Sequence, residues 1–113
     1  MPEVIPLESL RRGPTACLFE GGDRTPVSMF VTAYPERGQG PDLHVHPYPE
    51  VFLVEEGDGD FTAGDESVRV RAGSFVIVAA DTPHGFKNAG DTVLRVVSVH
   101  PNPHVIQTDL ATS

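Results

Sequence analysis

Several features are scarce in this sequence, and each scarcity excludes a class of protein. The chain has one cysteine, Cys17, so it cannot contain an intrachain disulfide. It has 8 Lys and Arg against 16 Asp and Glu, a formal net charge of −8, which disfavours binding to nucleic acid through a basic patch. No run approaches the roughly 18 consecutive apolar residues of a membrane span. Residues 1–12 lack the pattern of a signal peptide. We therefore expect a cytoplasmic protein without a nucleic-acid or membrane partner.

Length and turn residues limit the fold. The chain has 113 residues, among them 11 Gly and 11 Pro. Domains commonly hold roughly 100–200 residues, so residues 1–113 are predicted to form one domain. The many Gly and Pro residues leave little room for long helices and suit short strands joined by turns. Disorder is expected at the two ends, residues 1–6 and 109–113.

The apolar residues recur mostly with period two, which indicates β-strands. Residues 27–34 and 66–71 alternate in this way. Three further runs are rich in β-formers and apolar on both faces for much of their length: 50–56, 74–79 and 92–99. About eight short strands separated by Gly-containing turns predict an all-β sandwich or barrel. Only residues 103–110 are compatible with a helix, with Asn102 as its cap.

Three histidines and one glutamate have the spacing of a metal site. His44 and His46 are two residues apart, which places both on one face of a strand. Glu50 has the same parity, and His84 lies forty residues after His44. A His-x-His pair alone is more often incidental than ligating. Three imidazoles and one carboxylate, however, suit one divalent Mn, Fe, Co, Ni, Cu or Zn ion, and not Ca or Mg. Four protein ligands on an octahedral ion leave two positions open, as a catalytic metal requires.

Two segments resemble the conserved motifs of the cupin family. Residues 38–57 follow the first motif: Gly38, five residues, His44-x-His46, three residues, Glu50, six residues, Gly57. Residues 73–88 follow the second at Gly73, His84 and Asn88, while Ala79 and Asp81 replace its internal Pro and Gly. Together the motifs cover residues 38–88. Asp81 can still adopt the left-handed backbone conformation in place of the glycine of the motif, because Asp tolerates a positive φ better than most residues.

The resemblance implies a fold and a metal centre. The implied fold is a conical antiparallel β-barrel, the small double-stranded β-helix or jelly roll. The implied ligands of the metal are His44, His46, Glu50 and His84. It also allows Glu50 to loosen and act as a base. In this reading the histidines are neutral and Glu50 is ionised. A divalent ion would then give a +1 centre that favours an anionic oxygen ligand.

Other residues have two readings each. Phe52 and Val54 share parity with Glu50, and Phe86 with His84, so they are expected to wall a substrate pocket; the alternative is plain core. Tyr48 is expected to be a loop aromatic between two prolines, although it or Tyr34 could contact a substrate. The remaining histidines, His100 and His104, lie outside both motifs. We expect them in a surface tail, with a second metal site as the alternative.

The function expected from these residues is a metal-dependent enzyme acting on a small organic oxygen ligand. Dioxygenase chemistry on an enol, diketone or phenolic compound is favoured, with isomerase or lyase chemistry next. A non-catalytic module that binds a metal or small ligand is the alternative. We also expect a homodimer. Val51 and Leu53 face outward if Glu50 faces inward, so a second subunit or the N-terminal segment must cover them.

Overall fold

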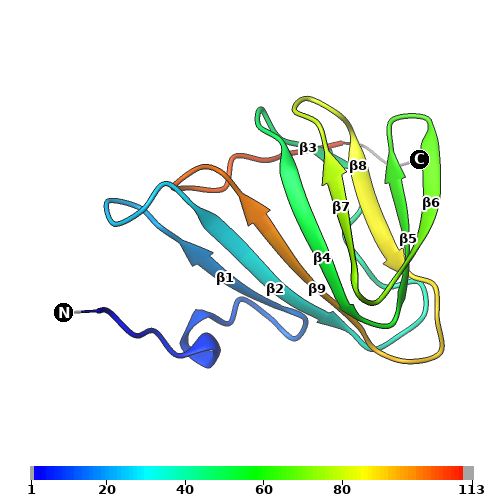
Figure 1. The fold of residues 1–113 in the computed structure, drawn as a ribbon, viewed down its shortest axis with the longest axis horizontal. Helices are drawn as coiled ribbons and strands as arrows, with labels where there is room; N and C mark the ends of the chain where they lie inside the picture. The colour runs from blue at the N-terminus through cyan, green and yellow to red at the C-terminus, as the bar shows by residue number, and fades with distance from the viewer. Residues whose placement is uncertain (1, 111–113) are drawn as a thin grey trace.

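The computed structural model describes residues 2–110, and ten strands account for nearly all of their regular structure (Figure 1). The strands are β1 (Ala16–Glu20), β2 (Ser28–Tyr34), β3 (His44–Val45), β4 (Glu50–Glu56), β5 (Asp58–Ala63), β6 (Glu66–Arg71), β7 (Ser74–Val78), β8 (His84–Asn88), β9 (Leu94–His100) and β10 (Thr108–Asp109). One short 3₁₀ turn, η1 (Leu7–Leu10), precedes them. No helix in the described part of the chain is long and apolar enough to cross a membrane.

The strands form two antiparallel sheets that face each other. The first sheet has the order β1-β2-β9-β4-β7, and the second has the order β10-β3-β8-β5-β6. The predicted all-β cupin-type barrel is confirmed. Alternation along β4 directs Glu50, Phe52 and Val54 inward, where all three are buried. Phe52 and Val54 belong to an apolar core between the sheets, whose buried members are Phe52, Val54, Phe61, Val70, Val78, Phe86, Leu94 and Val96.

Strand direction brings distant residues to one end of the barrel. β4 begins at Glu50 and β9 ends at His100, and the two strands pair antiparallel with Val51 opposite Val99. β8 begins at His84, directly opposite His44 of β3. The starts of β4 and β8 therefore meet the end of β9 at the same rim.

Two turn residues position the strands of this rim. Gly40 has a φ of 150°, and a Cβ added there would lie 2.1 Å from the carbonyl oxygen of Phe86. The segment before His44 can thus pack tightly against β8. Asp81, which replaces the glycine of the second motif, has a φ of 60°, as predicted. Its amide donates to the carbonyl of His46 over 2.9 Å, so the altered turn is tied to the rim.

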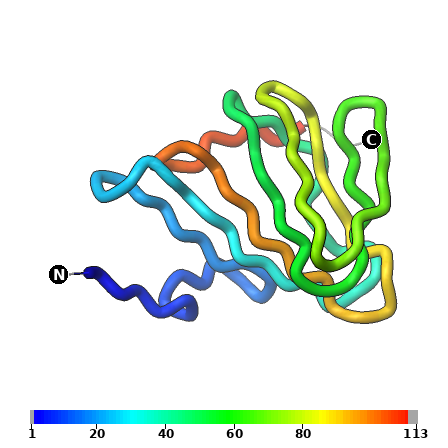
Figure 2. The backbone as a smooth tube through the Cα atoms, in the orientation of Figure 1, coloured from blue at the N-terminus to red at the C-terminus, as the bar shows by residue number. Residues whose placement is uncertain are grey.

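The chain after β9 is not helical, contrary to the prediction for residues 103–110. It runs along the end of the barrel from β9 to β3, as Figure 2 shows, and we call residues 101–110 the tail. The tail closes with β10, which pairs with β3. The amide of Val105 donates to Glu20 Oε2 over 2.9 Å, and the amide of Leu110 donates to the carbonyl of Leu43. A helix over these residues would have joined the Leu110 amide to the Ile106 carbonyl, whereas the structure pairs the first with Leu43 and the second with His46.

The structure describes part of each end for which disorder is expected. Glu3 forms an ion pair of 2.7 Å with Arg24, and Asp109 lies in β10. The other parts of that prediction, residue 1 and residues 111–113, lie outside the described residues.

Candidate metal centre

The four predicted ligand residues converge at the rim. His44 and Glu50 come from β3 and β4, His46 follows β3, and His84 begins β8. All four are buried, and their candidate ligand atoms all lie within 4.8 Å of one another. The cluster therefore has the size and the donors to hold one metal ion.

Backbone carbonyls orient three of the imidazole rings. Nδ1 of His44 lies 2.7 Å from the carbonyl oxygen of Asp42. Nδ1 of His46 lies 2.8 Å from that of Ile106, and Nδ1 of His84 lies 2.8 Å from that of Thr82. A carbonyl oxygen only accepts, so each Nδ1 carries the hydrogen and donates it. With a metal bound, each ring would be neutral and would offer the lone pair of Nε2, as metal-binding histidines do.

Glu50 supplies the negative charge of the cluster. Its Oε1 lies 3.0 Å from Nε2 of His46 and 2.9 Å from Nε2 of His84. Burial alone would raise the pKa of this carboxyl, but the neighbouring imidazoles of His100, His46 and His84 outweigh burial and hold the pKa well below its ordinary value. Glu50 is therefore ionised over the physiological range.

The two histidines of the His-x-His pair differ in their pKa values. Burial lowers the pKa of His44 below its ordinary value. Burial also opposes the charged form of His46, but the adjacent Glu50 carboxylate and the Ile106 carbonyl outweigh it and raise the pKa. In the metal-free protein, His46 therefore holds a proton to higher pH than His44 does.

The unpaired atoms of the cluster fit a metal ion. Nε2 of His46 and Nε2 of His100 are buried and have no hydrogen-bond partner among residues 2–110. Buried polar atoms in proteins are nearly always partnered, so an unpartnered imidazole nitrogen beside a carboxylate indicates a missing ligand. A set of three nitrogens and one oxygen matches the donors that divalent transition metals accept.

His100 belongs to this cluster, which sequence analysis did not foresee. It is 1% exposed, and its Nε2 lies 3.0 Å from Oε2 of Glu50. Its Nδ1 lies 2.8 Å from the hydroxyl of Tyr48. Parity could have indicated it, because Leu94, Val96, Ser98 and His100 alternate inward along β9. The other histidine, His104, has a side chain 66% exposed and lies in the tail.

Tyr48 also has a structural partner beyond its loop. Its ring stacks on that of His46, with an interplanar angle of 5° and a centroid distance of 5.2 Å. Its hydroxyl accepts a hydrogen bond of 3.1 Å from the amide of Ile106. The side chain therefore links the tail to the cluster.

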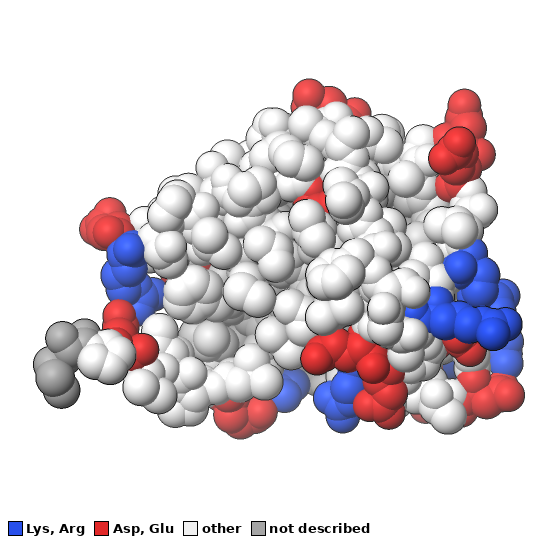
Figure 3. Space-filling view, viewed as in Figure 1, with Lys and Arg blue, Asp and Glu red and all other residues white. Residues whose placement is uncertain are grey.

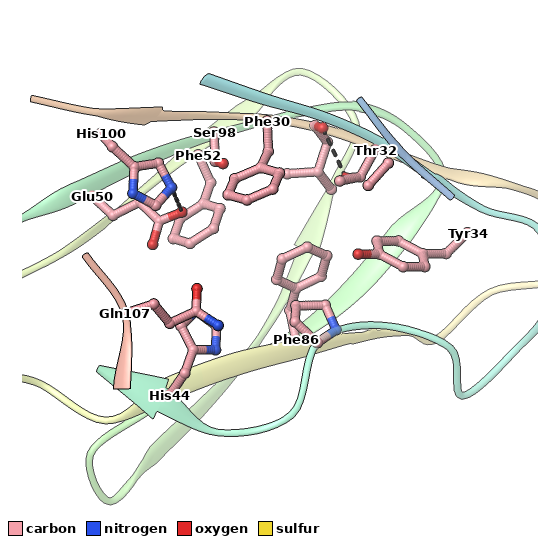
Figure 4. A pocket seen from close by; sticks show the side chains of 13 residues that line it. Phe30, Thr32, Tyr34, His44, Glu50, Phe52, Phe86, Ser98, His100 and Gln107 are labelled. Atoms are coloured by element: carbon pink, nitrogen blue, oxygen red, sulfur yellow. Dashed lines mark hydrogen bonds and ion pairs between the residues drawn. The ribbon is translucent and has the colours of Figure 1, made fainter. Parts of the chain in front are cut away.

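A cavity of about 190 Å³ opens beside the cluster, between the two sheets (Figure 4). His44, Glu50 and His100 form its polar end, and Phe30, Phe52 and Phe86 contribute aromatic wall. Its remaining lining residues are Ala16, Thr32, Tyr34, Pro41, Val96, Ser98 and Gln107. Figure 4 shows the Tyr34 hydroxyl pointing into this space, and burial raises the pKa of that phenol.

The predicted pocket residues divide into two kinds. Phe52 and Phe86 line the cavity. Val54 does not, because it lies two residues further along β4, where it is 0% exposed and packed in the apolar core. For Val54 the plain-core reading is the right one.

The barrel and its buried His and Glu cluster define a metal-binding cupin protein. A family profile described as "Cupin domain" matches residues 30–100. The chain belongs to the cupin family. That profile spans the cluster from before His44 to His100.

Known proteins resemble the chain to different extents. It is 33% identical over 88 residues to a protein named polyketide synthase CurC, from Streptomyces cyaneus, covering 68% of this chain and 57% of the relative. A structure of oxalate decarboxylase from Bacillus subtilis superposes with a TM-score of 0.81 at 17% identity, covering 92% of this chain and 30% of that one. A structure of oxalate oxidase with the substrate analogue glycolate gives a TM-score of 0.71 at 20% identity, covering 86% and 56%. At these identities the structures show a shared fold.

Proposed function

We propose that this protein is a metal-dependent enzyme in which a small organic oxygen compound binds at the metal from the aromatic cavity. The observation that supports this most strongly is the placement of the cavity: His44 and Glu50 of the cluster form part of its wall. The ligands of the metal in this proposal are His44, His46, Glu50 and His84. A ligand in the cavity would therefore lie beside two of the four residues that would hold the ion.

The charge of the centre favours an anionic oxygen. Three neutral imidazoles and one carboxylate leave a bound divalent ion with a net charge of +1. The aromatic wall excludes water and strengthens that attraction. When bound, the metal supplies Lewis acidity and a template for substrate, and an iron, manganese or copper ion also supplies redox chemistry. An enolate or phenolate fits both the charge of the centre and the aromatic wall.

Glu50 acts as a ligand in this proposal and not as a general base. An effective base has a pKa near the working pH. The pKa of Glu50 is held well below its ordinary value by its imidazole neighbours, so it has little tendency to take up a proton. The catalytic role considered for Glu50 is thus the least supported part of the sequence-based expectation.

Dioxygenase chemistry on an enol, diketone or phenolic compound is the first reaction class to test. The polyketide synthase relative supports a ligand of this kind, since polyketides are rich in enolisable and phenolic groups. Isomerase or lyase chemistry is the second class, favoured by Tyr34. Burial keeps its phenol protonated and its hydroxyl points into the cavity, so it could donate a proton.

The test begins with the metal content of protein purified from its own host. Oxygen uptake and substrate loss are then measured against a panel of enols, diketones and phenolics. Substrate loss with oxygen uptake supports a dioxygenase, and substrate loss without it supports an isomerase or lyase. Binding of panel members without turnover would make the protein a binding module. Protein that neither retains nor takes up a divalent transition metal would overturn the proposal. Glu50→Gln is the inactive control, and Glu55→Gln, exposed on the same strand, is its matched partner.

A further inference from the structure

The cavity beside the cluster has a second polar end, at Tyr34. The inward residues of β2 lie opposite inward residues of β9: Ser28 opposite His100, Phe30 opposite Ser98, Thr32 opposite Val96 and Tyr34 opposite Leu94. The cluster therefore lies at one end of these two strands, and Tyr34 lies at the other. Figure 4 shows the same order, with phenylalanine rings of the cavity between its two polar ends.

Tyr34 lies too far along its strand to reach the cluster itself. The six residues from its partner Leu94 to His100 rise by about 20 Å along β9. The Tyr34 side chain covers part of this distance, because its hydroxyl points into the cavity (Figure 4). Phenylalanine lines much of the rest: Phe30 and Phe52 from the first sheet and Phe86 from the second. A ligand that touches both polar ends must therefore cross an aromatic section.

Buried groups hold Tyr34 in place. Its ring packs edge to face against Phe86, with a centroid distance of 5.8 Å and an interplanar angle of 79°. The side-chain amide of Asn88 donates to the backbone carbonyl of Tyr34 over 2.8 Å. Asn88, the last residue of the second motif, is itself only 2% exposed. A ligand would therefore meet the Tyr34 hydroxyl in a preformed position, which lowers the entropic cost of binding.

The hydroxyl of Tyr34 has a hydrogen to donate to a ligand. Burial raises the pKa of this phenol above its ordinary value, and the neighbouring Thr32 hydroxyl offsets the effect only in part. The phenol therefore keeps its hydrogen at neutral pH. The Thr32 hydroxyl donates its own hydrogen to the carbonyl of Val96 over 3.0 Å. At this end of the cavity, Tyr34 is thus the side chain that offers a donor to a ligand.

The volume of the cavity limits the size of its ligand. An apolar cavity of about 150 Å³ holds one molecule of benzene. At about 190 Å³, this cavity has room for one six-membered ring and its substituents. Flat rings pack well against the faces and edges of phenylalanine side chains, which form the middle section. A ligand of several fused rings would have to extend out of the cavity and lose contact with one of its ends.

We propose that this cavity selects a single-ring compound with oxygen atoms on opposite sides of the ring: an anionic oxygen at the metal and a hydrogen-bond-accepting oxygen at the hydroxyl of Tyr34. Tyr34 is then a specificity-determining residue, because it recognises the end of the substrate that is remote from the metal. It would contact that end in either of the reaction classes considered above. This inference rests on the metal-dependent function proposed above and specifies its substrate class.

Two phenols and one variant test the contact with Tyr34. Para-hydroxyacetophenone carries a carbonyl oxygen opposite its phenol oxygen, and para-isopropylphenol has nearly the same shape without that carbonyl. Both are titrated into Zn²⁺-loaded protein, because Zn²⁺ has no redox chemistry. Tyr34→Phe keeps the ring and loses one neutral hydrogen bond, so it should bind para-hydroxyacetophenone about 3–10-fold more weakly. Its affinity for para-isopropylphenol should equal that of the natural protein. Comparing the two proteins with each phenol in turn cancels the difference in acidity between the phenols.

The infrared spectrum of the isotope-labelled probe carbonyl gives a second readout. A hydrogen bond from Tyr34 should lower its stretching frequency in the natural protein, and the shift should be absent in Tyr34→Phe. Equal losses of affinity for both phenols, no loss for either, or an unshifted carbonyl would overturn the inference. Failure of both phenols to bind, or binding of the same strength without Zn²⁺, would count against the proposed function and against this inference with it.

A larger probe tests the limit of one ring. The naphthalene analogue, with its hydroxyl and acetyl groups on different rings, should bind the natural protein about tenfold more weakly than para-hydroxyacetophenone or worse. Equal or tighter binding would overturn the single-ring limit.

Two controls separate recognition by Tyr34 from indirect effects. Ser67→Ala removes an exposed hydroxyl of the second sheet and should bind both phenols as the natural protein does. Tyr34→Phe should keep the Zn²⁺ affinity of the natural protein, because its hydroxyl is remote from the cluster. Weaker Zn²⁺ binding would show that Tyr34 supports the cluster, and would overturn its assignment to the far end of the ligand. Thermal unfolding shows that each variant is folded.

Discussion

The two sheets of this barrel differ on both faces: they contribute different residues to the site on the inside, and they expose different side chains on the outside. On the inner face, the second sheet contributes imidazoles that are oriented by backbone carbonyls close by in the chain or in the tail. The first sheet contributes the carboxylate of Glu50 and its partner His100, which are held by contacts between side chains. One sheet thus presents nitrogen donors, and the other sets the charge.

The outer faces differ as strongly. On the first sheet, two rows of apolar side chains cross the strands, one through Ile77, Val51, Val99 and Met29, the other through Phe75, Leu53, Val97 and Val31. Figure 3 shows a broad area of the surface with few charges, which gather at its margins. The second sheet carries ion pairs such as Arg69–Asp60 and Lys87–Asp42. The second sheet is therefore suited to water, and the first to a cover.

Removing the charge that the first sheet supplies should have the largest effect. Glu50→Gln keeps the shape of the side chain and removes its anion. Loss of an outer partner costs about 10–100-fold in metal affinity, so loss of the anionic ligand should cost ~100-fold or more. Isothermal titration with Zn²⁺ measures it, with Glu55→Gln as the exposed control. Equal affinities in the two variants would contradict the role of Glu50.

Lowering the pH should have the next largest effect on metal affinity, because it protonates imidazoles that the second sheet contributes. The Glu50 carboxylate raises the pKa of His46, so this ring takes up a proton first as the pH falls. The pKa of His44 is lowered by burial, so that ring stays neutral to lower pH. A metal must displace each bound proton, so affinity should fall between about pH 7 and 5, by up to about tenfold per pH unit for each proton. A metal-competition series measures the slope, and a flat curve would exclude this set of ligands.

The outer face of the first sheet should bind a second copy of the chain. Phe75 and Ile77 are 68% and 74% exposed, and Val4 of the N-terminal segment is 85% exposed, so that segment leaves apolar surface uncovered. We therefore still expect a homodimer, with twice the 12.2 kDa of one chain in light scattering. Ile77→Asp should yield the mass of one chain, while Ser67→Asp on the second sheet should not.

Two results would change this view of the outer face. A natural protein with the mass of a single chain at micromolar concentration would refute the homodimer. Deletion of residues 2–10 separates the two possible covers: weaker association would mean that the N-terminal segment reaches the partner, and unchanged association would place the contact on the sheet alone.

The smallest effect on metal binding is expected from a substitution in the apolar core between the two sheets. Val54→Ala removes two buried carbons and should cost about 1–2 kcal/mol of unfolding free energy. Because Val54 does not line the cavity, Zn²⁺ affinity should stay unchanged. Phe52→Ala opens the cavity wall and should lower both the free energy of unfolding and the affinity for Zn²⁺. Chemical denaturation and Zn²⁺ titration separate the two variants, and a loss of affinity in Val54→Ala would contradict the division.

Local patterns in the sequence predicted much of this organisation. Alternation in residues 50–54 placed Glu50, Phe52 and Val54 inward, and motif spacing selected the four residues that converge at the rim. The positive φ of Asp81 followed from the tolerance of its side chain. Each of these depends on residues near one another in the chain or on spacing within a motif.

The features that escaped prediction depend on long-range pairing. His100 looked like part of a Pro-rich tail. The alternation that begins at Leu94 reaches it, but only its pairing with Ser28 of β2 shows that β9 continues that far. The expected helix at 103–110 failed for the same reason. The amide and carbonyl of Ile106 are used by Tyr48 and His46, residues about sixty positions away.

The tail shows that the site depends on residues beyond those matched by the family profile. The cupin profile ends at residue 100. A fragment trimmed there would keep all five polar side chains of the cluster. It would lose the Ile106 carbonyl that turns His46 toward the cluster and the Ile106 amide that anchors Tyr48. Anyone who grafts this centre into another scaffold must therefore carry over the tail as well, because its backbone completes the site.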